Sequence, residues 1–199
     1  MNFRLITRGD DIITLEQARE HLKLVVVGDS PATHPEDDMV DRLRRAAQDA
    51  CRVYLGRYLS QCVAELRIAN FASVVRLPYP PVHSIAHVKY LDGDGAEQTL
   101  DTDSYTFIDD LNNPHIIFHD WPSVDDRSDA VRIRMSLGYT EPGSSPHATA
   151  LPEDVNSAAY LLLSHWYENR GAVNVGNLVT SMPLSATWML DQHRVELGV

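Results

Sequence analysis

The segment DGDGAE, which starts at Asp92, has residues of the types that bind calcium. A calcium loop between two helices needs an acidic or amide residue at its fifth position, glycine at its sixth and glutamate at its twelfth. Those positions hold Ala96, Glu97 and Asp103, and the residues on either side follow a strand pattern. The segment is therefore predicted to form the turn of a β-hairpin.

A second set combines His115 and His119 with several aspartates, and such a set could bind a metal ion. On a strand, however, the two histidines lie on one face with roughly 13 Å between their Cα atoms. That distance is too long for two ligands of one ion unless the strand breaks, and then only an ion between His119 and Asp120 would fit. We therefore expect surface histidines and no metal site.

Two cysteines, Cys51 and Cys62, are the remaining candidates for chemistry, but they have no metal-binding or redox spacing. They are expected to be buried or idle reduced thiols. The sequence has no Gly-x-Ser-x-Gly elbow, phosphate-binding loop or dinucleotide fingerprint. His165, beside Trp166, is expected to be a packed or capping residue. The sequence therefore predicts neither enzyme activity nor a cofactor.

Negative charge is concentrated in one part of the chain. The net charge is −11, and residues 92–129 hold eleven acidic residues and one arginine. A surface this acidic repels phosphate, so sequence-specific DNA binding through it is not expected. It would suit a channel through which DNA slides without sticking, although a solvated face that maintains solubility is the favoured interpretation. No run of residues is apolar enough for a signal peptide or a membrane span.

Helical patterns come first and last in the sequence, and strand patterns lie between them. Thr14 and Gln17 match a capping box that opens a short helix ending near Leu24. Pro35 and Glu36 begin a longer helix that Gly56 ends, with an apolar face formed by Val40, Leu43, Ala47, Ala50 and Tyr54. About six short strands are predicted between residues 61 and 137. A last long helix begins after Pro152, and Gly171 could end it.

This order predicts an α+β chain that is mainly α. Its core would be a small bundle of three principal helices with an inserted antiparallel β-rich subdomain and an extended C-terminal tail. The predicted divisions are the N-terminal helices of the bundle (1–60), the acidic β-rich insertion (61–139), a linker (140–151), the long C-terminal helix (152–171) and the tail (172–199).

Two surfaces are candidates for contacts with other subunits or proteins. The second predicted helix has balanced charges from Glu36 to Arg57, and the face opposite its apolar one suits a solvated or subunit-facing salt-bridge surface, formed by Arg42, Arg45, Asp49 and Arg52. The tail is too short to build its own core, yet it holds apolar residues: Trp188, Met189, Leu190, Val195 and Leu197. Such residues either dock on their own chain or bind another protein, and the sequence leaves both open.

Four segments, in this order, resemble the gp6-like head-tail connector (adaptor) proteins of tailed phages. They are ITLEQAREHLKL, DDMVDRLRRAAQDACRVYLGRYL, LPYPPVHSIAHVKYLDGDGAEQTLDTDSYTF and LPEDVNSAAYLLLSHWYENR. In the second segment, Tyr54, Gly56 and Arg57 fill the Tyr-x-Gly-Arg turn of that family. The resemblance covers most of residues 12–171 and weakens after Asn174.

This resemblance implies a structural protein of the virion neck, made in the bacterial host cytoplasm. It implies a homo-oligomeric ring of about twelve copies under the portal protein, with unlike faces that meet head to tail. The ring would extend the DNA channel without sequence-specific DNA binding, and it would dock a stopper or tail-completion protein. On this interpretation the α-helical charges would serve the ring contact and the tail would reach the portal.

Two other interpretations of the sequence stay open. The chain could be another neck component, such as a stopper or tail-completion protein, although the long helices argue against the compact β-barrel expected of stoppers. It could also be a metal-dependent hydrolase that uses the aspartates and histidines of the insertion, for which the sequence offers no assembled site.

Overall fold

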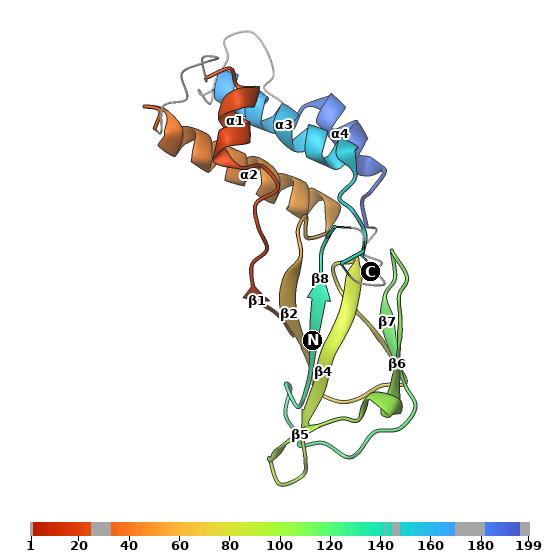
Figure 1. Cartoon of the computed structure of the whole chain (residues 1–199). Coiled ribbons are helices and arrows are strands. Elements are labelled where there is room, and N and C mark those ends of the chain that lie inside the picture. Colours follow the sequence, from red (N-terminus) through yellow and green to blue (C-terminus); the bar gives the residue numbers. More distant parts are fainter. Residues whose placement is uncertain (1, 25–32, 142, 145–147, 170–181, 196–199) are drawn as a thin grey trace. The chain divides into compact units, whose positions relative to one another are not determined.

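The computed structural model describes residues 2–24, 33–141, 143–144, 148–169 and 182–195 (Figure 1). The chain divides into two compact units. One, here called the sheet unit, consists of Met1–Asp10 and Arg57–Ala150. The other, the helical unit, consists of Asp11–Gly56 and Leu151–Val199. Both units are therefore built from two separate stretches of sequence.

The sheet unit contains two antiparallel sheets. The larger has the strand order β1-β2-β8-β4-β5, and these strands are Asn2–Thr7, Cys62–Ile68, Val131–Leu137, Val82–Leu91 and Glu97–Thr99. The smaller has the order β3-β7-β6, with Val74–Arg76, His115–Phe118 and Tyr105–Ile108. A single 3-10 turn, η1 (Thr102–Ser104), precedes β6. Figure 1 shows the small sheet apart from the five strands of the large one.

One face of the large sheet packs against the small sheet through the apolar core. The pattern is clearest in β8, where every second residue is fully buried: Val131, Ile133, Met135 and Leu137. The core continues into the small sheet through Val75, Ile116 and Phe118. Because successive side chains of a strand point to opposite faces, the residues between the buried ones lie on the outer face of the large sheet. This alternation confirms the strand predicted at Val131–Leu137.

The hairpin predicted at DGDGAE is confirmed. Strands β4 and β5 pair across it, and the Asp92 carboxylate accepts the backbone N–H groups of Asp94 (3.1 Å) and Ala96 (2.9 Å). Gly95 has a φ of 77°, a conformation in which glycine carries no side-chain penalty. The Asp92 oxygen that could bind a cation thus satisfies the backbone of the turn instead.

The helical unit contains α1 (Leu15–His21), α2 (Asp37–Leu55), α3 (Glu153–Glu168) and α4 (Leu184–Asp191). Helix α2 packs against each of the other three, and α3 also packs against α4. The capping box of α1 is confirmed, because the Thr14 hydroxyl accepts the Gln17 N–H (3.2 Å) and Gln17 accepts the Thr14 N–H (2.8 Å). Gly56 ends α2 at a φ of 66°, as predicted. Gly171 lies outside the described residues, and Asn169 is the last residue of the α3 cap.

The expectation of a mainly α chain is wrong. Roughly 31% of the described residues are helical and 26% lie in strands. Part of the difference comes from β1, in a region predicted to be helical or irregular, which pairs with β2 from Asn2 opposite Arg67 to Thr7 opposite Val63. Residues 184–191, which the sequence assigned to an extended tail with at most a short helix, do form a helix, and it belongs to the helical unit.

The buried stripe of α2 also differs from the predicted apolar face. Leu43, Ala50 and Tyr54 are only half-buried, whereas two polar residues, Arg44 and Gln48, are buried. The complete buried set is Val40, Arg44, Ala47, Gln48, Cys51 and Leu55. An apolar face was expected because polar residues seldom occupy the buried face of a helix. In α2, hydrogen bonds compensate the burial of Arg44 and Gln48.

Candidate interaction surfaces

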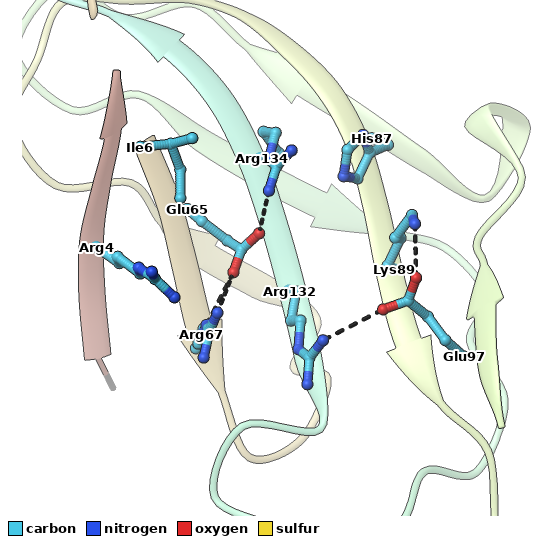
Figure 2. Close-up of a pocket in the computed structure, with 9 residues that line it drawn as sticks. All are labelled: Arg4, Ile6, Glu65, Arg67, His87, Lys89, Glu97, Arg132 and Arg134. Atoms are coloured by element: carbon cyan, nitrogen blue, oxygen red, sulfur yellow. Dashed lines mark hydrogen bonds and ion pairs between the residues drawn. The ribbon is translucent and has the colours of Figure 1, made fainter. Parts of the chain in front are cut away.

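Charged side chains cover the outer face of the large sheet. The antiparallel register aligns Arg4 of β1, Glu65 of β2, Arg134 of β8 and His87 of β4 in one row. A second row, two residues along, aligns Arg67, Arg132 and Lys89. With Glu97 of β5, these residues line a shallow hollow of about 310 Å³ (Figure 2). We call this set the charged sheet face: Arg4, Glu65, Arg67, His87, Lys89, Glu97, Arg132 and Arg134.

Two carboxylates hold this face in order. Glu65, which is only 5% exposed, accepts hydrogen bonds from Arg67 (2.8 Å) and Arg134 (2.9 Å). Glu97 pairs with Lys89 (2.6 Å) and Arg132 (3.2 Å), as the dashed lines in Figure 2 show. Glu65 thus links β2 to β8, and Glu97 links β5 to β4 and β8. These ion pairs hold Arg67, Arg132 and Arg134 in position, whereas Arg4 takes no part in them.

The pKa values in this face follow from burial and charge. Burial alone would raise the pKa of Glu65, but the hydrogen bonds from Arg67 and Arg134 outweigh it and lower that pKa. Burial, followed by the charges of Arg134 and Lys89, lowers the pKa of His87 below its ordinary 6.5. At neutral pH the face therefore holds a charged Glu65 and a neutral His87.

The charged sheet face has more positive than negative charge. It combines five arginine or lysine side chains with two glutamates, in a chain whose net charge is −11. Arg4 is exposed, and it forms no ion pair with any residue that the structure describes. The Nε atoms of Arg132 and Arg134 are buried and lack a hydrogen-bond acceptor among the described residues. The face is thus a rigid, incompletely neutralised surface that suits an acidic partner.

The predicted charged face of α2 forms a local network of ion pairs. Arg42, Arg45 and Asp49 are exposed, and Arg52 is half-buried. Arg45 pairs with Asp41 (2.8 Å), and Arg52 pairs with Asp49 (3.1 Å). The structure therefore brings the four predicted residues onto one helix, with much of their charge already balanced there.

Sequence reasoning missed Arg44 and Gln48, which join α2 to the segment before α1. The Arg44 guanidinium donates to Asp11 (2.6 Å), Asp41 (2.5 Å) and the carbonyl oxygen of Ile13 (2.8 Å). The Gln48 side-chain oxygen accepts the backbone N–H of Ile12 (2.6 Å). Their positions continue the helical spacing of the buried residues, and this spacing was the signal that could have identified them.

The five tail residues predicted to contact a partner do not share one surface. Trp188 is 68% exposed, whereas Leu190 is fully buried in the helical unit. Met189 and Val195 are half-buried, and Leu197 lies outside the described residues. Leu190 thus docks on its own chain, which was one of the two alternatives.

Leu184 was not singled out from the sequence, but at 81% it is the most exposed large apolar residue in the described ranges. It lies four residues before Trp188, so both project from the same side of α4. Together they form a small exposed apolar surface on this helix, which we call the α4 surface.

The candidate metal ligands and thiols have ordinary structural partners. The His115 ring contacts the Asn113 carbonyl oxygen (2.9 Å), and the His119 ring contacts the Thr106 hydroxyl (2.7 Å). No group of three or more ligating side chains occurs within the part of the chain that the structure describes. Both cysteines are buried and neither forms a disulfide, as predicted, and burial raises the pKa of Cys51 to about 12. Among the described helices, none is long and apolar enough to cross a membrane.

Comparison with known proteins finds likeness in structure but not in sequence. No protein-family model and no curated protein matches the chain. Solved structures do match over 100% of this chain and 98% of theirs. They are chains from the neck of an empty gene transfer agent particle computed with C6 symmetry (TM-score 0.77, 20% identity) and from a native gene transfer agent virion (0.74, 20%). A third is from the neck of a native particle computed with C12 symmetry (0.72, 18%). The chain therefore has the fold of a protein found in the neck of these particles.

Proposed function

We propose that this chain is a structural protein of a phage-like virion neck, where it forms an adaptor ring under the portal. The observation that carries the proposal is the fold match, which extends over nearly the whole of both chains. The matching necks were computed with C6 and C12 symmetry, which fits subunits arranged in a ring. The four sequence segments that resemble gp6-like connectors point to the same role.

The ring would extend the DNA channel and dock a stopper or tail-completion protein, without sequence-specific contacts to DNA. The acidic residues of the 92–129 segment support a surface that does not bind phosphate. The described residues hold no assembled metal or nucleophile site on which catalysis could be proposed. The helical unit favours an adaptor over a stopper, which we expect to be a compact β-barrel.

Electron microscopy of lysates from the source particle, with an early stop codon in this gene, tests the proposal. We expect DNA-filled heads that lack a neck ring, together with unjoined tails, and we expect a plasmid copy of the gene to restore joined particles. Joined, infectious particles in the absence of the protein would overturn the proposal. A ring that stays on the heads while the tails remain unjoined would instead indicate a stopper or tail-completion protein.

We also propose that the α4 surface contacts the portal. Exposed Trp188 and Leu184 are the large apolar residues that α4 offers to a partner, and buried tryptophans commonly dominate the binding energy of an interface. Replacing both with alanine is expected to weaken binding to purified portal rings by about thirtyfold. The thermal stability of the isolated chain should hardly change. The alanine variant of Leu190 is unsuitable for this test, because its side chain is fully buried.

Val53→Ala provides a matched control for the portal experiment. Val53 is an apolar residue of α2 that is 68% exposed, the same fraction as Trp188. Its replacement should leave portal binding unchanged in a co-sedimentation assay. If the control, the wild type and the α4 double variant bind the portal equally well, the proposal that α4 contacts the portal is rejected.

A further inference from the structure

We infer that the charged sheet face binds an acidic patch on a second copy of this chain. The patch surrounds η1 and consists of Asp101, Asp103, Asp120 and Trp121. This inference rests on the proposed function, because it supplies the lateral contact between neighbouring subunits of the ring. It goes beyond that function by naming the residues on each side of the contact.

The acidic patch is assembled from two loops of the sheet unit. Asp101 and Asp103 belong to η1 and its cap, while Asp120 follows β7. The two loops are joined because the Ser104 carbonyl oxygen accepts the His119 N–H (2.9 Å). Asp101, Ser104 and Asp120 line a second hollow of about 310 Å³ together with Trp121, and Asp103 is the residue before Ser104 in η1. The patch is therefore a formed surface and more than a run of acidic sequence.

The patch is available to an outside cation. All four of its side chains are exposed, and Trp121 is 39% exposed. The carboxylates of Asp103 and Asp120 have no hydrogen bond or ion pair with any residue in the described ranges. An exposed tryptophan beside carboxylates is a good receptor for arginine, because a guanidinium can stack on the ring while it pairs with the acids.

The charged sheet face and the acidic patch are separate surfaces of the sheet unit, because the two hollows share no lining residue. The face is on the outer side of the large sheet, away from the apolar core. The patch adjoins β6 and β7, and the hollow that it lines is also bordered by Tyr90 of β4 and Thr99 of β5. A subunit with two complementary surfaces that do not overlap can bind the next copy head to tail, and such contacts form a ring when the rotation between subunits closes.

The composition of the face favours this protein partner over DNA. Glu65 and Glu97 lie between the arginines, so the face alternates in sign, whereas a phosphate backbone is uniformly negative. The exposed Arg4, which has no ion pair among the described residues, leaves positive charge for discrete carboxylates. The excess acid of residues 92–129 would also repel DNA from the same unit.

Reversing the charge of each surface separately tests the inference. The face-reversed variant is Arg4→Glu with Lys89→Glu, and the patch-reversed variant is Asp103→Lys with Asp120→Lys. In sedimentation velocity at low ionic strength, the wild type is expected to self-associate and to dissociate as salt is added. Each variant alone should associate at least tenfold more weakly, because two like-charged surfaces then meet.

An equimolar mixture of the two variants distinguishes lost contact from misfolding. In the mixture the reversed face meets the reversed patch, and the unchanged face meets the unchanged patch, so alternating copies should associate again. Lys23→Glu with Arg76→Glu is a matched control for the face-reversed variant, because it makes the same change in net charge at exposed residues elsewhere. This control should associate like the wild type.

Several outcomes would overturn the inference. The first is a wild type that stays monomeric at low salt at every protein concentration tested. The second is that each charge-reversed variant associates like the wild type. The third is that the equimolar mixture of the two variants does not regain association. Loss of association in Arg42→Glu with Arg45→Glu, while the face-reversed variant associates normally, would move the contact to α2. Binding of a fluorescent DNA duplex that only the face-reversed variant loses, with unchanged self-association, would assign the face to nucleic acid.

The stop-codon experiment keeps this inference separate from the proposed function. Missing neck rings without the protein, combined with normal association of the charge variants, would retain the adaptor role and reject this contact. Joined particles without the protein, combined with recovery in the mixture, would retain the contact and reject the adaptor role.

Discussion

The two units place their charged side chains in opposite ways. In the sheet unit, the two-residue period of β8 separates Ile133 and Met135 in the core from Arg132 and Arg134 on the outer face. In the helical unit, Arg44 and Gln48 lie inside, where they satisfy the backbone of an irregular segment. The sheet therefore leaves charge available to a partner, whereas the helices use much of theirs to bind their own chain. Two of the four predictions below test the interactions of each unit, and they run from the largest expected effect to the smallest.

The largest effect is expected from Ile133→Ala, in the centre of the sheet core. Ile133 is fully buried, and removing a buried isoleucine side chain costs about 3 to 4 kcal/mol of unfolding free energy. Urea denaturation would measure the loss, and hydrogen exchange should locate it in β2, β4 and β8. Val74→Ala, at a site that is 50% exposed, is the control and should change little. Equal effects of the two variants would contradict a core centred on β8.

Arg44→Met tests whether a buried charge stabilises the helical unit. The variant keeps much of the side-chain volume but leaves the Ile13 carbonyl and Asp11 without their buried donor. We expect a loss of about 2 kcal/mol, with faster hydrogen exchange in α1 and α2. Arg45→Met is the matched control, because Arg45 is 53% exposed and should contribute under about 0.5 kcal/mol. A higher unfolding free energy in Arg44→Met would show that apolar packing at this position stabilises the unit more than the hydrogen bonds of Arg44 do.

Glu65→Gln tests the electrostatic order of the charged sheet face. The folded-state pKa of Glu65 lies below its ordinary 4.5, so the unfolded chain takes up its proton at a higher pH than the folded chain. The stabilisation from Glu65 is thus complete above pH 4.5 and is lost as the pH falls through the folded-state pKa. Urea denaturation between pH 3 and 7 should show a weaker pH dependence in the variant, and about 1 kcal/mol less stability at pH 7.

A control for the pH experiment is Glu97→Gln. Glu97 also pairs with two basic residues, but its side chain is 42% exposed, so water screens the pairs. The pH dependence should change less than in Glu65→Gln. The same slope in both variants would show that burial of Glu65 adds nothing to its ion pairs.

Thr14→Ala should give the smallest effect of the four, about 0.5 kcal/mol, because it removes the side-chain cap of a short helix at an exposed site. The loss should be confined to α1 and be visible as faster exchange of its first-turn amides. Gln17→Ala removes only the reciprocal bond and is expected to cost less. A larger loss in Gln17→Ala would mean that the glutamine side chain matters for more than capping.

Local patterns predicted most of the secondary structure in this chain. The strands at Tyr105–Ile108 and Val131–Leu137, the Asp92 hairpin, the Thr14 cap and the Gly56 stop all follow from neighbouring residues. Strand β1 was missed because its residues are mostly exposed and its pairing with β2 spans about sixty positions, which no local window detects.

The charged sheet face could not be predicted for the same reason. It requires the register of β1, β2, β8 and β4, which brings together Arg4, Glu65, Arg134 and His87. In sequence these residues are dispersed basic and acidic side chains. The burial of Leu190 likewise depends on tertiary packing of α4, which a short apolar tail segment does not reveal.

The interleaving of the two units has a consequence for synthesis on the ribosome. The sheet unit has all its strands once Leu137 has emerged, but the helical unit waits for α3, which begins at Glu153. Helix α2 thus precedes its packing partner by roughly 100 residues, or about 5 to 20 s of translation. During that interval the face of α2 that is later buried against α3 stays exposed to solvent and to chaperones. A nascent chain stalled after β8 would therefore display a finished sheet unit beside two helices still without the rest of their core.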